Sequence, residues 1–207
     1  IKYLGGFYNP IQIIFFSVLF GFPLLTFYIL KSPKTGSLWP HHPLAMLMRA
    51  FSTSISAASA FYAFSSLPLA QTYALLFLTP ISITILSVPI LGENVGFRRA
   101  AAILTGFLGV LIVIQPGIID FTYGHLAGLI AVLGATSNSL ITRKIGQKEK
   151  MSVMLLYPML SNFLIMSFLL PFVYLPMPLQ HLGSIALISV LGFFAMFLII
   201  SAFNCSS

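Results

Sequence analysis

Few residues in this chain could do acid, base or metal chemistry. Its acids are Glu93, Asp120 and Glu149, and none lies within a long apolar run. His41 and His42 are adjacent rather than spaced as helix-borne metal ligands, and no glycine-rich phosphate loop occurs. The sequence therefore predicts no catalytic residue, no metal site and no cofactor, and it disfavours an enzyme acting inside a membrane.

The first group of polar candidates begins at Arg49. Steps of three and four residues carry its helical face on to Ser52 and Ser56, through a stretch made almost wholly of small residues. Such a stretch allows close helix packing, and lining a water-filled cavity is the alternative. Arg49 either snorkels to the membrane surface as a topology anchor or lines a pathway or gate.

A second group surrounds Pro80, which we expect to kink a helix and free the carbonyl group of Leu76. The same face carries Tyr73, Phe77 and Thr84. This mixed aromatic and polar face suits an organic solute, and helix packing alone is the alternative.

Asn138 is the third candidate, because it extends a stripe of small residues that begins at Gly124 and Gly128. Its amide serves either as glue between helices or as a polar group of the cavity. Glu93 stands near Arg98 and Arg99 at the end of an apolar run. These three charged residues form a structural ion pair or cap, or they act as gate contacts in a loop.

Composition identifies the elements that must position these residues. With 58% hydrophobic and 6% charged residues, the chain is unlike a soluble domain. The net charge of +7 is spread between apolar runs rather than along one face, so nucleic acid is not an expected partner. We predict an all-α, polytopic membrane helix bundle with seven apolar runs, near Asn9–Leu30, Pro43–Ser66, Leu67–Leu91, Arg99–Gln115, Phe121–Thr142, Met151–Leu175 and His181–Phe203.

The basic residues predict the orientation. The connections Lys31–His42, Gly92–Arg98 and Arg143–Lys150, with Arg49 and Arg99, hold nine of the ten Lys and Arg residues. By the positive-inside rule these connections are cytoplasmic, which places the first residue outside and the last inside. Lys31 and Lys34 belong to the first of these loops. The single cysteine, Cys205, excludes a disulfide within the chain.

The order of motifs in the middle of the chain resembles a known family. A small-residue helix leads into Leu67-Pro68-Leu69-Ala70, and a proline-interrupted run follows it. Leu91-Gly92-Glu93 and a glycine-punctuated run ending in Pro116-Gly117 come next. This order resembles the EamA-type repeat of the drug/metabolite transporter superfamily, from about Arg49 to Gly117 and again from Gly124 to Lys144.

The resemblance implies ten helices in two inverted five-helix repeats, of which this chain would hold helices two to eight. Residues 1–117 would form the first repeat and residues 118–207 the second, each incomplete. An Arg near the start of the small-residue helix is common in this family. The inverted pairing relates Asn9–Leu30 to Met151–Leu175 and Pro43–Ser66 to His181–Phe203, and each pair runs in opposite directions under the predicted orientation.

We therefore expect a permease that moves a small organic metabolite by alternating access, as a facilitator or exchanger, in the bacterial inner membrane. A seven-helix receptor and a non-transporting assembly subunit are the alternatives; a receptor is disfavoured by short outer loops and by the lack of a lysine in the seventh run. Because no acid lies in a span, we expect neutral, zwitterionic or anionic substrates. The expected partners are the lipid bilayer and the metabolite, and a homodimer is an open alternative.

Overall fold

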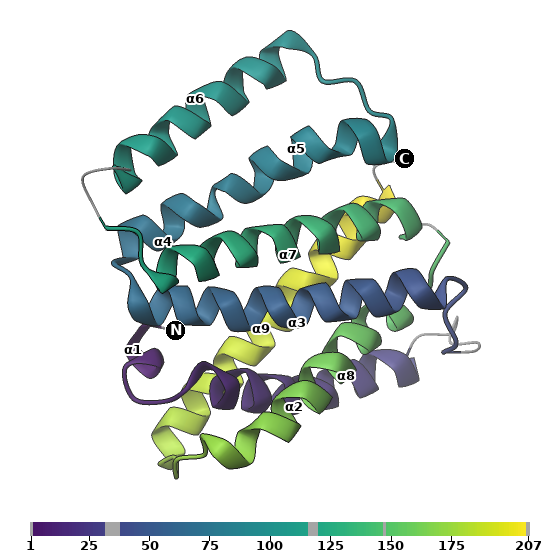
Figure 1. The fold of residues 1–207 in the computed structure, drawn as a ribbon. Coiled ribbons are helices and arrows are strands. Elements are labelled where there is room, and N and C mark those ends of the chain that lie inside the picture. The colour runs from purple at the N-terminus through teal and green to yellow at the C-terminus, as the bar shows by residue number, and fades with distance from the viewer. Residues whose placement is uncertain (1, 32–37, 116–119, 147, 206–207) are drawn as a thin grey trace.

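The computed structural model describes residues 2–31, 38–115, 120–146 and 148–205, and Lys34 and Pro116-Gly117 lie outside these ranges. In this part of the chain all regular structure is helical. Figure 1 shows the elements, whose bounds are α1 (Lys2–Gly5), α2 (Pro10–Lys31), α3 (Pro43–Ser66), α4 (Leu69–Leu76), α5 (Leu78–Leu91), α6 (Phe97–Ile114), α7 (Tyr123–Ile145), α8 (Met151–Leu169), η1 (Leu170–Phe172) and α9 (Leu179–Cys205).

Seven helical segments are long and apolar enough to cross a membrane. They agree with the seven predicted runs, because an apolar segment in hydrocarbon must satisfy its own backbone and a helix does so internally. One span consists of α4 and α5, which are separated at Phe77. Pro80 lies in the first turn of α5, so the predicted interruption is present and lies one turn before the proline.

Local sequence signals set several helix ends. Gly92 ends α5 in the left-handed conformation, with a φ of 71°, which glycine adopts without steric cost. At the start of α7, Thr122 forms a capping box with His125, whose Nδ1 accepts a hydrogen bond from the Thr122 backbone N–H over 3.2 Å.

The centre of the bundle is the antiparallel contact between α3 and α7 (Figure 1). A Cβ atom added to Gly134 would lie 2.8 Å from the carbonyl oxygen of Ser52 and 2.9 Å from the Cβ atom of Ser56. Near the other end, a Cβ atom on Gly124 would lie 2.8 Å from Leu67 Cγ. The small residues of both helices therefore let the two backbones approach closely, as their spacing predicts.

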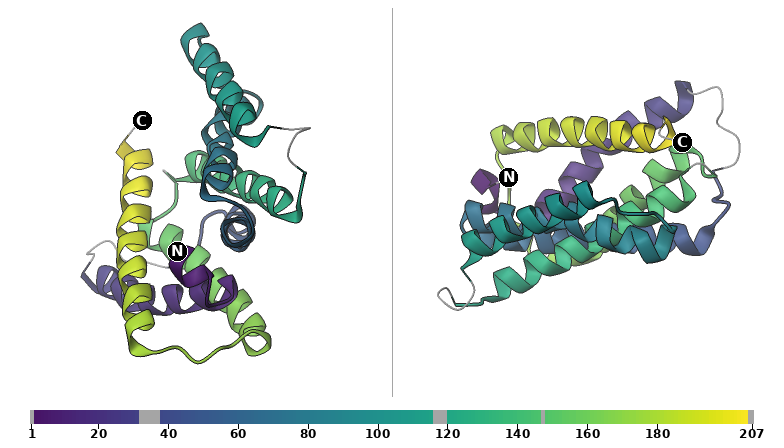
Figure 2. Two further views of the ribbon diagram at one scale, coloured as in Figure 1. Left: turned by 90° about the vertical axis from the view of Figure 1, so that its left-hand side faces the viewer. Right: turned by 90° about the horizontal axis from the view of Figure 1, so that it is seen from above.

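A second group of helices, α2, α8 and α9, packs beside α3, as the two views of Figure 2 show. Helix α2 contacts α9, and α3 contacts α8. The predicted inverted repeat pairs α2 with α8 and α3 with α9. When each helix is replaced by its pair, the contact of α2 with α9 becomes the contact of α8 with α3, so the two contacts correspond under the predicted repeat. Helix α6 packs against α4 and α5 and lies at the edge of the bundle in Figure 1.

The described helix ends that flank the three basic connections lie at one end of the bundle, on the right in Figure 1. There the backbone N–H of His42 donates to Glu149 Oε1 over 2.7 Å. At the opposite end, Tyr8 contacts His181 through a hydrogen bond of 2.7 Å. Gln12 holds the backbone of Leu175 through two hydrogen bonds of 2.5 and 3.0 Å. The predicted grouping of the basic loops is therefore confirmed, and which side of a membrane they face stays a prediction.

Candidate functional site

Arg49 lies inside the bundle and has no exposed surface. Its Nε donates to Thr142 Oγ1 over 2.7 Å, and its Nη1 donates to the carbonyl oxygen of Met154 over 2.6 Å. That carbonyl is free because Pro158, four residues later in α8, has no N–H to donate to it. One guanidinium thus joins α3, α7 and α8, and its side chain does not snorkel to water.

The charge of Arg49 is not neutralised within its surroundings. No carboxylate lies within ion-pair distance of the guanidinium in the ranges that the structure describes, and Nη2 is buried without a hydrogen-bond partner there. An uncompensated cation at the centre of a membrane costs about 2.5–3.5 kcal/mol on insertion scales. Arg49 therefore depends on its neutral acceptors, Thr142, Met154 and the sulfur of Met46, and its predicted role in a pathway stays a prediction.

The other candidates of the first group lie at the contact between α3 and α7. Ser56 Oγ donates to the carbonyl oxygen of Ala131 over 2.8 Å, and the backbone of Ser52 abuts Gly134. Asn138 lies one turn from Gly134, and its Oδ1 is buried with no partner among the described residues. For Ser56 the geometry is that of interhelical glue, whereas Asn138 keeps an unused acceptor.

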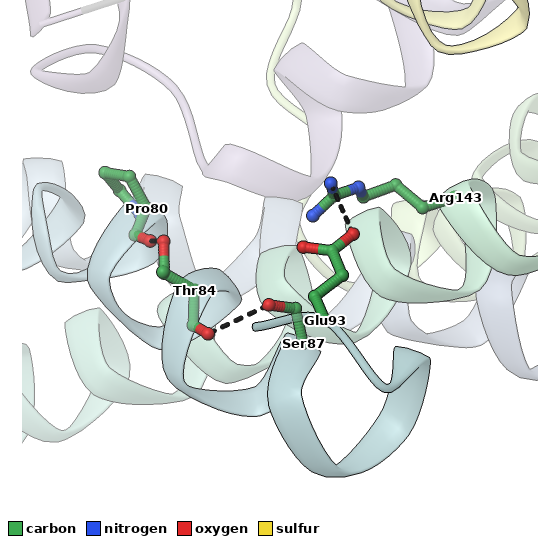
Figure 3. Close-up of polar contacts among 5 residues, drawn as sticks. All are labelled: Pro80, Thr84, Ser87, Glu93 and Arg143. Atoms are coloured by element: carbon green, nitrogen blue, oxygen red, sulfur yellow. Dashed lines mark hydrogen bonds and ion pairs between the residues drawn. The ribbon is translucent and has the colours of Figure 1, made fainter. Parts of the chain in front are cut away.

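The second group lines a pocket of about 630 Å³ between α5 and α6. Phe77, Pro80, Thr84 and Arg99 contribute to it, and most of its wall is apolar. Thr84 donates its hydroxyl to the carbonyl oxygen of Pro80 over 2.8 Å, and Ser87 donates to the carbonyl of Thr84 over 2.9 Å (Figure 3). Because the hydroxyl proton of Thr84 serves the helix itself, this pocket offers a ligand mainly apolar contact.

Tyr73 and Arg98 lie apart from these pocket contacts. The Tyr73 side chain is about half exposed, and its ring meets Phe64 edge to face with centroids 5.3 Å apart. Arg98 is exposed in the first turn of α6. Apart from Tyr73, Arg98 and Glu93, the predicted candidates form two groups, one at the contact between α3 and α7 and one at the pocket between α5 and α6.

Glu93 is paired, although with a different arginine than its position in the chain suggests. Its Oε1 lies 2.7 Å from Nη2 of Arg143, and both side chains are about one-third exposed (Figure 3). This ion pair ties the connection between α5 and α6 to the end of α7. An exposed pair of this kind contributes little to stability, about 0–1 kcal/mol, so its main effect is to hold one connection against another helix.

Sequence reasoning missed a second cavity, of about 320 Å³, between α2, α3, α8 and α9. Its polar side chains are Ser17, Thr53, Asn162 and Ser189, one from each helix. A signal was present in α8, where Asn162 follows Pro158 by one turn within an apolar run. Ser17 and Ser189 gave no signal, because an isolated serine in an apolar span is ordinary.

Comparison with known proteins gives the family. Residues 1–115, more than half of the chain, match the sequence model of the EamA-like transporter family. The chain belongs to this family. The family is part of the drug/metabolite transporter superfamily, as the order of motifs indicated. No solved structure matches the chain.

Several curated relatives of this EamA-family chain are named transporters. It is 26% identical over 215 residues to an S-adenosylmethionine uptake transporter of Rickettsia prowazekii, covering 98% of this chain and 69% of the relative. A protein of the same name in Rickettsia bellii is 27% identical over 160 residues, 75% of this chain and 53% of the relative. A riboflavin transporter of Vibrio cholerae is 37% identical over 93 residues, 45% of this chain and 31% of the relative. The chain thus spans between about a third and 69% of the length of these relatives.

Proposed function

We propose that this chain is part of a permease that moves a small organic metabolite across a membrane by alternating access. The observation that carries the proposal is the match of residues 1–115 to the EamA-like transporter family. Seven segments able to span a membrane, and relatives named as transporters of two metabolites, support it. Hydrogen bonds hold the loops at each end of the bundle, at His42 at one end and at Gln12 at the other. In alternating access, such contacts break at one end while they hold at the other.

The distribution of charge supports a substrate class. The three acids of the chain all lie outside its seven spans, so a cationic substrate would find no carboxylate there. The proposed substrate is therefore neutral, zwitterionic or anionic. Among the metabolites after which the relatives are named, riboflavin is uncharged, and it has a planar ring of the kind that aromatic side chains contact. Riboflavin is thus the first substrate to test.

The absence of acids in the spans also bears on energy coupling. Proton exchange in small transporters commonly relies on a carboxylate inside the membrane, which binds substrate and proton in competition. Without such a group in these spans, the proposed mode is facilitated diffusion or exchange. The proposed location is the bacterial inner membrane, with the basic end of the bundle in the cytoplasm.

Counterflow in proteoliposomes tests the proposal. The full-length product of the gene is reconstituted, unlabelled riboflavin is loaded inside, and entry of labelled riboflavin is followed with and without an imposed pH gradient. We expect transient accumulation of label that does not depend on the gradient. Asn138→Ala should slow entry without lowering the amount of protein, because it removes a buried acceptor that the fold does not use.

Two outcomes would contradict the proposal. Accumulation that strictly requires the pH gradient would exclude the facilitator or exchanger mode. No accumulation of labelled riboflavin, together with none for a mixed pool of labelled amino acids and nucleosides, would exclude a metabolite permease. Liposomes without protein, and protein carrying Thr105→Val on the exposed surface of α6, are the controls.

A further inference from the structure

The cavity lies between α3 on one side and α2, α8 and α9 on the other. Its volume is about 320 Å³, and each of the four helices contributes one polar side chain to a wall that is otherwise apolar. Helices α2 and α8 belong to one pair of the predicted inverted repeat, and α3 and α9 to the other. In many transporters a site at the interface of inverted repeats is the one that both open states can reach.

Two of the four polar side chains are already used by the protein. Ser189 Oγ donates to the carbonyl oxygen of Ser17 over 2.6 Å. Thr53 Oγ1 donates to the carbonyl oxygen of Arg49 over 2.8 Å. These bonds hold α9 to α2 and close a turn of α3, so neither hydroxyl proton is free for a ligand.

The other two side chains have unused hydrogen-bonding capacity. Ser17 Oγ and Asn162 Oδ1 are buried and have no hydrogen-bond partner in the part of the chain that the structure describes. A buried polar atom left without a partner destabilises the fold, so such atoms are usually matched by a bound molecule or by function. The two residues come from α2 and α8 and line the same cavity.

The chemistry of these groups defines what fits. The amide of Asn162 offers an acceptor and a donor side by side, and this holds whichever way the amide is oriented. The hydroxyl of Ser17 can donate or accept. A ligand must therefore carry a donor next to an acceptor, as an amide or an imide does.

The cavity also selects against charge. Its wall contains no ionisable side chain, and Arg49, one turn from Thr53, directs its guanidinium at Thr142 and Met154 instead. An ion that entered would lose its hydration with no opposite charge to compensate it, which costs far more than a hydrogen bond returns. A neutral molecule has no such penalty.

We propose that this cavity binds a small uncharged molecule through its amide or imide group, with Asn162 and Ser17 as the hydrogen-bonding residues. The cavity is separate from the pocket between α5 and α6, and the proposal concerns binding, so it does not depend on transport being measurable. If the proposed permease function holds, this is its substrate-selective site for neutral metabolites.

Substitutions at glycines test whether the ligand occupies this cavity. At Gly21 an added Cβ atom would lie 2.8 Å from Met159 Cε, so α2 already approaches α8 closely there. At Gly192, which lines the cavity, an added Cβ atom meets no atom within 4 Å among the described residues. Gly192→Leu therefore adds a large side chain at the cavity wall without removing a hydrogen bond. Gly183, also on α9 and also open, is the matched control.

The experiment measures binding to the purified full-length protein in lipid nanodiscs. Riboflavin, which carries an imide, is titrated by its fluorescence, and nicotinamide and nicotinate compete as an amide and its charged counterpart. We expect Asn162→Leu to weaken riboflavin binding about tenfold and Ser17→Ala several-fold, as loss of one neutral hydrogen bond predicts. Gly192→Leu should abolish binding, whereas Gly183→Leu and Ser184→Ala should not, because Ser184 bonds only within α9. Nicotinamide should compete and nicotinate should not.

Several results would overturn the assignment. Wild-type affinity in both Gly192→Leu and Asn162→Leu would place the ligand elsewhere. Equal competition by nicotinate would exclude selection for uncharged molecules. No quenching of riboflavin and no saturation transfer to nicotinamide in NMR would exclude the ligand class. Counterflow that persists in Gly192→Leu would overturn this site and leave the permease proposal intact. Binding without counterflow would overturn the permease proposal and leave this site intact.

Discussion

At the scale of single residues, the most informative contact joins an arginine to a proline that lies in a different helix. Pro158 leaves the carbonyl of Met154 without its helical donor, and Arg49 supplies one from α3. Thr142 completes the arrangement, because its Oγ1 accepts from Arg49 and donates to the carbonyl of Asn138 over 2.6 Å. The hydrogen bond between Arg49 and Met154 thus gives a partner both to a buried cation and to a carbonyl that proline leaves free, each of which is costly when unpaired.

Thr142→Val tests this arrangement. Valine has nearly the same shape as threonine, but it leaves Nε of Arg49 without an acceptor, so we expect the free energy of unfolding to fall by about 1–3 kcal/mol. The measurement is the midpoint of unfolding by sodium dodecyl sulfate in mixed micelles. Thr105→Val is the matched control, since the exposed Thr105 hydroxyl bonds only to Ala101 within α6. Equal midpoints for the two variants would show that Arg49 does not depend on Thr142.

Individual contacts were the least predictable part of the molecule. The sequence singled out Arg49 and Asn138, yet it left open whether Arg49 reaches water, because nothing in α3 alone reveals the carbonyl freed in α8. The partner of Glu93 could not be predicted either. Arg98 and Arg99 are nearer in the chain, but the fold brings Arg143 to 2.7 Å. Such pairs depend on which helices become neighbours, and local patterns do not contain that information.

At the scale of the helices, prediction succeeded because the membrane imposes a simple rule. A long apolar run must become a helix that satisfies its own backbone, so the run Pro43–Ser66 and helix α3 have the same bounds. The stripe of small residues in α7 likewise predicted a tight helix contact without naming the partner helix. Helix α7 packs against α3 because α3 also carries small residues, which let Gly134 lie against the α3 backbone.

Gly134→Ala tests that contact. Its Cβ atom would lie 2.8 Å from a backbone oxygen of α3, which cannot rotate away, so the two helices must separate. We expect a loss of about 1–3 kcal/mol, typical of overpacking in a close-packed interior. Gly109→Ala in α6, where an added Cβ meets nothing within 4 Å among described residues, should be neutral or slightly stabilising. Detergent-unfolding midpoints compare the two, and a neutral Gly134→Ala would show that the contact is looser than the geometry indicates.

At the scale of the whole molecule, the ends of the bundle differ in charge. The connections between α2 and α3, α5 and α6, and α7 and α8, together with the helix ends beside them, carry most of the basic residues. Glu149 bonds to His42 across two of these connections, and Glu93 ties the third to Arg143 at the end of α7. The opposite end is held by Gln12 and Tyr8, through hydrogen bonds to Leu175 and His181. The difference in charge between the two ends could be predicted, because each span reverses the direction of the chain and every second connection therefore lies at the same end.

The side of the membrane that the basic end faces is tested with single cysteines. In a Cys205→Ser background, Lys148→Cys and Gln180→Cys place one thiol at each end of the bundle, at positions that are both exposed. Basic residues near span ends resist translocation, so we expect Lys148 to face the cytoplasm. A membrane-impermeant maleimide added to intact cells should therefore label the cysteine at 180 and not the one at 148. Permeabilised cells should give labelling at both positions, which controls for access to each thiol. Labelling at 148 alone in intact cells would reverse the orientation, and with it the direction assigned to every span.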